Sequence, residues 1–134
     1  MNLDQLIRGK KAVVGVIGLG YVGLPLVRLF ALKGFRVLGF DIDAVKIDKL
    51  RRGASYIKSV PDAVLRKIRS KFEATADFGR LGEAHAVIIC VPTPLLADGR
   101  PDLSFIRVTA RTIARNLRKG QLSCLLYTSP SPRD

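Results

Sequence analysis

The sequence contains little cysteine and histidine, and each shortage excludes a class of protein. Its 134 residues include two cysteines and one histidine. Cys90 and Cys124 are too few for a disulfide framework or a cysteine metal site, so we expect a cytoplasmic protein without a metal centre. His85 directly precedes a predicted strand, which favours a loop residue over a catalytic base.

Long apolar runs are also absent. No stretch approaches the ~20 residues that span a bilayer, and the N-terminus lacks the apolar segment of a secretory signal peptide. We therefore expect neither a membrane span nor an export signal.

Acidic residues are scarce, because 11 Asp and Glu stand against 23 Lys and Arg and leave a net charge of +12. Such an excess favours an anionic partner: nucleic acid, acidic lipid or a phosphorylated small molecule. The cations are evenly spread, 11 in residues 1–60 and 12 in residues 61–134. No strip of basic and aromatic residues stands out, which disfavours nucleic acid.

What the sequence does contain is an alternation of apolar, strand-like runs with amphipathic, helix-like segments. This alternation predicts an α/β fold, a Rossmann-type doubly wound parallel sheet covered on both faces. We expect an incomplete domain over residues 1–126, truncated at the C-terminus, and a non-native or disordered tail over residues 127–134. Strands are predicted at residues 12–17, 36–40, 72–75, 86–90 and 121–126, and helices from the glycine turn to Lys33 and at 43–52, 61–71 and 102–119.

Apolar residues at helical spacing predict which face of each helix is buried. On the first, Val22, Leu26, Leu29 and Phe30 share one side. On the second, Val45 and Leu50 are expected to face the sheet, with Ile47 as a further candidate. Asp43 and Asp102 are expected to cap the helices at 43–52 and 102–119.

The glycine turn carries the strongest functional signal. Gly18-Leu19-Gly20-Tyr21-Val22-Gly23 joins the first strand to the first helix, and Asp41 ends the second strand 23 residues after Gly18. This is the dinucleotide-binding fingerprint, in which the glycines permit a tight turn, close approach of a pyrophosphate and close helix packing. A structural turn without a ligand is the alternative.

Asp41 indicates which dinucleotide is bound. A carboxylate at this position accepts hydrogen bonds from the adenosine ribose and repels the 2′-phosphate of NADP, which favours NAD. Lys46, one helical turn further on, is placed to contact the ribose or phosphates. The alternative for Asp41 is a turn or capping acid.

A second candidate segment follows the strand at 86–90. Val91, Pro92 and Thr93 leave the carboxyl end of that strand, where ligands of open parallel sheets bind. Pro92 and Pro94 restrict the backbone around Thr93. This suits a wall of the cofactor pocket, and a rigid structural turn is the competing interpretation.

Several motifs together resemble the UDP-glucose/GDP-mannose dehydrogenase family, and within it the bacterial UDP-N-acetylglucosamine 6-dehydrogenases. The resemblance covers Lys11 to Leu122, the NAD-binding domain. It is carried by Gly18–Pro25, Gly39–Asp43 with Lys46, Gly53–Ile57, Cys90–Pro94 and Pro101–Leu103.

The resemblance implies an NAD-dependent enzyme. Family members oxidise the C6 alcohol of a nucleotide sugar to a carboxylate in two steps, through a thiohemiacetal on a catalytic cysteine. It also implies backbone contacts to NAD from Leu19 to Val22, contacts from Asp41 and Lys46 at the adenosine ribose, and contacts from Val91, Pro92 and Thr93. With Gly18 and Gly23 of the fingerprint, these residues make up the expected cofactor site. The complete enzyme is expected to be a homo-oligomer without nucleic-acid or membrane partners.

The chain departs from the family after Leu122, where Ser123-Cys124-Leu125-Leu126 replaces a glutamate-serine-threonine segment. The family's catalytic cysteine, lysine, asparagine and aspartate belong to later segments, so no catalytic residue is assigned here and this fragment is expected to be inactive. Alternatives are a UDP-glucose 6-dehydrogenase, a dehydrogenase of the 3-hydroxyacid or 6-phosphogluconate type, and a non-enzymatic NAD-binding module.

Overall fold

Five parallel strands form one sheet in the computed structural model, which describes residues 2–90, 96–100, 103–116 and 120–125. The sheet order is β3-β2-β1-β4-β5, and every neighbouring pair is parallel. The strand order reverses at β1, which confirms the doubly wound α/β fold. The strands are β1 (Val13–Ile17), β2 (Arg36–Phe40), β3 (Phe72–Thr75), β4 (Ala86–Ile89) and β5 (Leu122–Leu125).

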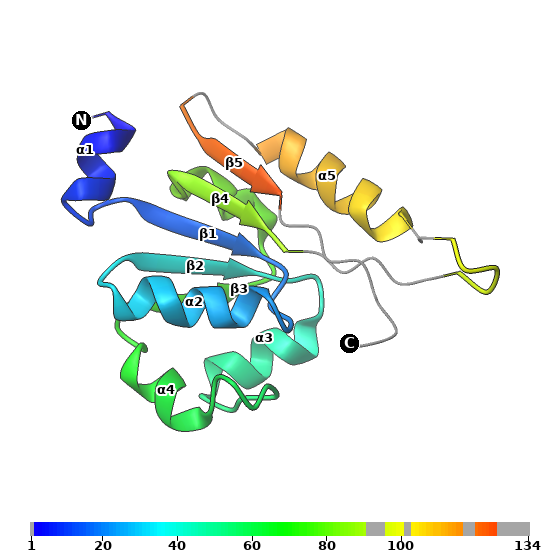
Figure 1. Ribbon diagram of the computed structural model, residues 1–134, viewed down its shortest axis with the longest axis horizontal. Helices are drawn as coiled ribbons and strands as arrows, with labels where there is room; N and C mark the ends of the chain where they lie inside the picture. The colour runs from blue at the N-terminus through cyan, green and yellow to red at the C-terminus, as the bar shows by residue number, and fades with distance from the viewer. Residues whose placement is uncertain (1, 91–95, 101–102, 117–119, 126–134) are drawn as a thin grey trace.

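Helices cover both faces of the sheet (Figure 1): α2, α3 and α4 lie on one side and α5 on the other. A short α1 precedes the sheet, and a 3-10 helix, η1, lies between β3 and β4. The bounds are α1 (Leu3–Arg8), α2 (Gly23–Leu32), α3 (Ala44–Arg51), α4 (Asp62–Lys67), η1 (Phe78–Glu83) and α5 (Ser104–Asn116).

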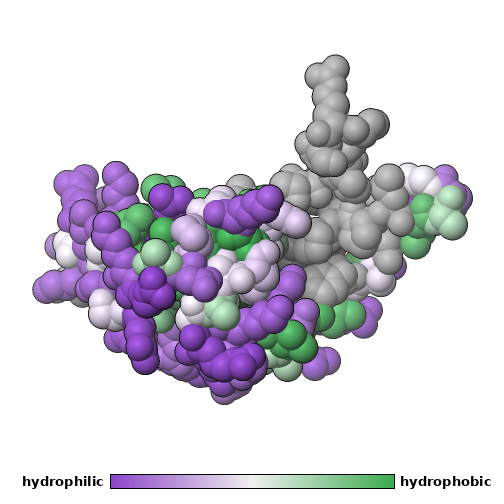
Figure 2. All heavy atoms as spheres, turned by 90° about the horizontal axis from the view of Figure 1, so that it is seen from below, coloured by the Kyte–Doolittle hydropathy of each residue, from purple (hydrophilic) through white to green (hydrophobic). Residues whose placement is uncertain are grey.

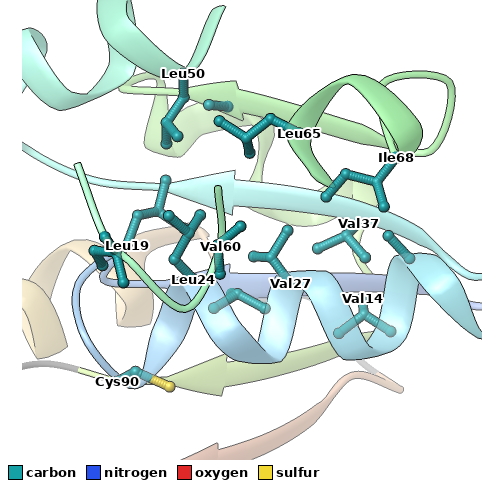
Figure 3. Close-up of a cluster of buried hydrophobic side chains, with 14 of the residues drawn as sticks. Val14, Leu19, Leu24, Val27, Val37, Leu50, Val60, Leu65, Ile68 and Cys90 are labelled. Atoms are coloured by element: carbon teal, nitrogen blue, oxygen red, sulfur yellow. The ribbon is translucent and has the colours of Figure 1, made fainter. Parts of the chain in front are cut away.

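The alternation of strand side chains divides the core in two. Val14 and Val16 of β1 point to the side of α2, α3 and α4, where Leu24 and Leu65 are buried against the sheet. Figure 3 shows this first core. Strand side chains that point to the opposite face of the sheet form the second core together with residues of the η1 region and α5. Its buried members are Ile17, Leu38, Phe40, Leu81, Ala84, Val87 and Ile113.

The rotation of α2 differs from the predicted one. Its buried residues are Gly23, Leu24, Val27 and Ala31, whereas Leu29 is 49% exposed, so its predicted burial was wrong. The close approach of Gly23 to the preceding turn fixes which side of α2 faces the sheet. The sequence of α2 is apolar nearly all round and did not by itself determine that side.

For α3 the prediction was right for Leu50 and Ile47 and wrong for Val45. Ile47 and Leu50 are buried, whereas Val45 is 64% exposed. Val45 lies two positions before Ile47, about 200° around the helix, and therefore on its opposite side. The predicted cap is present, because the Asp43 carboxylate accepts from the N–H groups of Val45 and Lys46.

One other helix is shorter than predicted. The helix expected to reach residue 71 ends at Lys67, and the N–H groups of Lys71 and Phe72 bond to the Ile68 carbonyl, which turns the chain into β3. Helix α5 is described as far as Asn116, and the predicted end of this helix at residue 119 lies outside the described residues. The predicted cap Asp102, the predicted pocket residues Val91, Pro92 and Thr93, and the tail 127–134 lie outside the described residues.

Hydrophilic residues dominate the face on which α3 and α4 lie, and hydrophobic patches there are small (Figure 2). Over the part of the chain that the structure describes, no helix combines the length and apolarity needed to span a bilayer. The same residues contain no group of three or more histidine, cysteine, aspartate or glutamate side chains that would hold a metal ion.

Candidate functional site

The glycine turn leaves the carboxyl end of β1 and begins α2. Gly18 has a φ of +93°, and its N–H bonds to the Phe40 carbonyl of β2 at 2.8 Å. A Cβ on Gly23 would lie 1.6 Å from the Gly18 carbonyl oxygen, so only glycine fits there. A Cβ on Gly20 would have no heavy atom within 4 Å, which leaves open space beside its backbone.

Leu19 anchors this turn in the core. Its side chain is fully buried and belongs to the first core, visible in Figure 3. A Cβ on Gly39 would lie 2.9 Å from Leu19 Cδ2 and 2.8 Å from Phe72 Cε1. Gly39 on β2 therefore leaves the space that Leu19 fills.

The turn presents a row of backbone donors. Within the described residues, no hydrogen bond uses the N–H groups of Gly20, Tyr21, Val22 or Gly23, and Val22, the N-cap of α2, has no side-chain cap. These groups coincide with the positive end of the helix dipole, the usual binding site for a phosphate. The Tyr21 side chain is 88% exposed and leaves the row accessible.

Asp41 lies directly beside this row and holds the turn in place. It is 8% exposed, and its two carboxylate oxygens accept from the N–H groups of Leu19 and Asp43, each at 2.9 Å. Asp41 is thus a turn acid, as the alternative interpretation had it. Each oxygen nevertheless keeps a further lone pair, so the carboxylate can also accept from a ligand hydroxyl.

A cavity of about 610 Å³ joins the glycine turn to the end of β2. Ten residues line it: Gly18, Leu19, Gly20, Tyr21, Val22, Asp41, Ile42, Asp43, Lys46 and Cys90. The structure therefore brings together the predicted glycine-turn residues, Asp41 and Lys46, although Gly23 is not among the lining residues. Two cavities of about 540 Å³ flank β3 and contain none of the predicted site residues.

Some lining residues were missed by the sequence interpretation. Ile42 and Asp43 line the cavity, and their position directly after Asp41 was the available signal. Tyr56 was also missed: its hydroxyl donates to the Leu19 carbonyl, and Lys46 Nζ lies 5.7 Å from the centre of its ring. Burial raises the pKa of Tyr56, and the Asp41 and Asp43 carboxylates raise it further.

Cys90 closes one side of the cavity but is not placed for nucleophilic chemistry. Its side chain is buried, and burial, with a smaller effect of Cys124, raises the pKa of the thiol to about 11. The thiolate is the reactive form, so Cys90 stays protonated and unreactive near neutral pH. A buried free cysteine of this kind packs as a small hydrophobic residue.

Comparison with known proteins bears on what fills this cavity. The UDP-glucose/GDP-mannose dehydrogenase family, NAD binding domain, matches residues 12–131. UDP-N-acetyl-D-mannosamine dehydrogenase of Escherichia coli K12 is 38% identical over 125 residues, which cover 89% of this chain and 28% of that protein. NDP-N-acetyl-D-galactosaminuronic acid dehydrogenase of Ralstonia nicotianae is 36% identical, over 96% of this chain and 30% of that protein.

A solved structure agrees with these matches. UDP-D-ManNAc dehydrogenase from Pyrococcus horikoshii superposes with a TM-score of 0.80 at 35% identity, over 90% of this chain and 29% of that chain. The present chain thus spans under a third of the length of the relatives that it matches.

Proposed function

The chain belongs to the UDP-glucose/GDP-mannose dehydrogenase family, whose NAD-binding domain it represents, and we propose that it binds NAD for a nucleotide-sugar 6-dehydrogenase. The observation that supports this most directly is the set of N–H groups at Gly20, Tyr21 and Val22, which adjoin a cavity that Asp41 also lines. Donors for a diphosphate and an acceptor for a ribose thus share one site.

Each group then has a role in binding. The N–H groups of the turn and the N-terminus of α2 bind the diphosphate. Asp41 accepts from the ribose hydroxyls and repels a 2′-phosphate, and Lys46 contributes positive charge at the rim of the cavity. Gly18 and Gly23 shape the turn. Val91, Pro92 and Thr93, outside the described residues, remain proposed contacts along the cofactor on the strength of the sequence alone.

The chemistry of the complete enzyme follows from the cofactor. NAD supplies a hydride acceptor, and oxidation of a C6 alcohol to a carboxylate uses two NAD in succession. The described residues bind and orient the cofactor, and Leu19 and Cys90 cover one end of the site with buried apolar groups. We assign no catalytic group among them, because burial holds the Cys90 thiol protonated.

The proposed substrate is a nucleotide-linked N-acetylhexosamine. Relatives named for UDP-N-acetyl-D-mannosamine and for an NDP-N-acetyl-D-galactosaminuronic acid support the acetamido sugar. The sequence motifs resemble enzymes of UDP-N-acetylglucosamine, which we keep as the first substrate to test. A cytoplasmic homo-oligomer remains part of the proposal.

Two measurements test this function. Calorimetric titration of the chain with NAD and NADP is expected to show binding that favours NAD. An enzyme containing this domain is expected to form two NADH per molecule of UDP-N-acetylglucosamine or UDP-N-acetylmannosamine. Binding of NAD with no turnover of any nucleotide sugar by that enzyme would instead indicate a non-enzymatic NAD-binding module.

A further inference from the structure

The peptide group between Leu19 and Gly20 is bonded at its carbonyl end. The Tyr56 hydroxyl donates to the Leu19 carbonyl oxygen. The N–H of the same peptide belongs to Gly20, which lines the cavity and has no acceptor within the described residues. A trans peptide is planar and its C=O and N–H point in opposite directions. A bond that fixes the carbonyl therefore also fixes the direction of the Gly20 N–H.

We propose that Tyr56 is a positioning residue for the diphosphate of NAD, acting through the Leu19–Gly20 peptide. This inference rests on the proposed function. Tyr56 does not itself contact the ligand: it orients the peptide and polarises it, because hydrogen bonds in a chain strengthen one another. The Gly20 N–H is thereby a stronger and better aimed donor to a phosphate oxygen.

The chain holds Tyr56 firmly enough for this role. Its ring packs against the first core, and the Lys46 ammonium lies over it at 5.7 Å. Its neighbours are fixed as well, since the Ser55 N–H bonds to Asp62 at 2.7 Å and the Ser55 hydroxyl donates to the Ile57 carbonyl at 3.0 Å. Because the Tyr56 hydroxyl is already ordered, little conformational entropy of this residue is lost when NAD binds.

Leu19 is held from its other side too. Its N–H donates to Asp41 at 2.9 Å, and its carbonyl accepts from Tyr56. The pKa of Tyr56 is raised by burial and by the Asp41 and Asp43 carboxylates, so the phenol remains a proton donor across the physiological range. The turn is thus held between an acceptor directly after β2 and a donor on the segment that follows α3.

Tyr56→Phe removes the hydroxyl and keeps the ring. Arg28→Gln is the matched control, because Arg28 Nη1 donates to the Ser59 carbonyl at 2.8 Å and anchors the same connecting segment through a different carbonyl from the one that Tyr56 binds. Dissociation constants for NAD, ADP and adenosine are measured by calorimetry on the parent chain and both variants. The loss of one neutral hydrogen bond predicts about 3- to 10-fold weaker NAD and ADP binding for Tyr56→Phe, with adenosine binding unchanged and all three affinities retained in Arg28→Gln.

A second readout needs no ligand. The Gly20 amide proton is expected to shift upfield in Tyr56→Phe relative to the parent chain, as a less polarised N–H, and to stay in place in Arg28→Gln. Unchanged NAD affinity in Tyr56→Phe, or an equal loss for adenosine, would overturn the positioning role while leaving the proposed function intact. A parent chain that binds no NAD would overturn both.

Discussion

Leu19 Cδ2 lies 2.9 Å from the point where a side chain on Gly39 would begin. Gly39 is on β2 and Leu19 follows β1. Because Gly39 has no side chain, the Leu19 side chain can be buried against β2. The position of the glycine turn therefore depends on a residue outside it.

We predict that Gly39→Ala destabilises the fold and weakens NAD binding together. The new Cβ would overlap Leu19 and Phe72, and overpacking of this kind costs about 1–3 kcal/mol. Thermal and denaturant unfolding measure the loss. Gly20→Ala is the matched control for stability, since its Cβ would meet no atom within 4 Å. Wild-type stability in Gly39→Ala would contradict the packing argument.

Gly20→Val tests the phosphate site itself. The branched side chain would occupy the open space beside the turn, where a pyrophosphate must approach the backbone. NAD binding is expected to fall below detection by calorimetry, while the circular dichroism spectrum and melting temperature stay close to those of the parent chain. Retained NAD affinity would show that the phosphates bind elsewhere.

Asp41→Ala tests cofactor choice. NAD is expected to raise the melting temperature of the parent chain more than NADP at equal concentration. The variant loses the ribose acceptor and the repulsion of a 2′-phosphate, so this difference should shrink. It also leaves the buried Leu19 N–H without its acceptor, which costs about 1–3 kcal/mol.

The control for that cost is Asp41→Asn, which keeps a side-chain oxygen but not the charge. If the asparagine variant keeps the full preference for NAD, the negative charge is not what selects the cofactor.

The Cys90 thiol is expected to alkylate slowly. Burial raises the pKa of this thiol from an ordinary value of 9.0 to about 11, which implies about 100-fold less thiolate at pH 8 than in an unperturbed cysteine. Iodoacetamide labelling of a Cys124→Ser chain, followed by mass spectrometry from pH 7 to 10, measures the rate, which should rise with pH throughout. Rapid labelling at pH 7 would show an activated thiol and reopen its assignment.

The 134-residue chain should form no NADH with UDP-N-acetylglucosamine, UDP-glucose or GDP-mannose. The reaction of the family needs a thiolate, and Cys90 does not supply one near neutral pH. Absorbance at 340 nm detects turnover directly. Steady production by purified chain would mean that a catalytic group among these residues was missed.

The sequence predicted the features that depend on neighbouring residues. The β1 run, the glycine turn and the acid that ends β2 are local patterns, and α3 has its cap at Asp43 as expected. The prediction of helix faces was less successful for Leu29 and Val45, because contacts with the sheet set how each helix is rotated.

The role of Tyr56 could not be predicted, because it depends on a contact between residues far apart in the sequence. Its partner, Leu19, is 37 residues away in sequence, and no spacing rule connects a tyrosine after α3 with a carbonyl before α2. Gly39 is a similar case, since a strand glycine has no periodic signal of its own. Both contacts appear only when β2 pairs with β1 and α3 folds back over the sheet.

Every described group of the proposed adenosine and diphosphate site, apart from Cys90, comes from the continuous stretch between Gly18 and Tyr56. Among the residues that the structure describes, the buried members of the first core likewise come from Val14 to Ala74, with Cys90 as the one addition. A chain emerging from the ribosome would therefore carry a complete β1–β2–β3 layer with its helices before β4 is synthesised. Parallel strand pairing through crossover helices closes slowly, and NAD bound to this layer would stabilise a nascent chain that still lacks its second core.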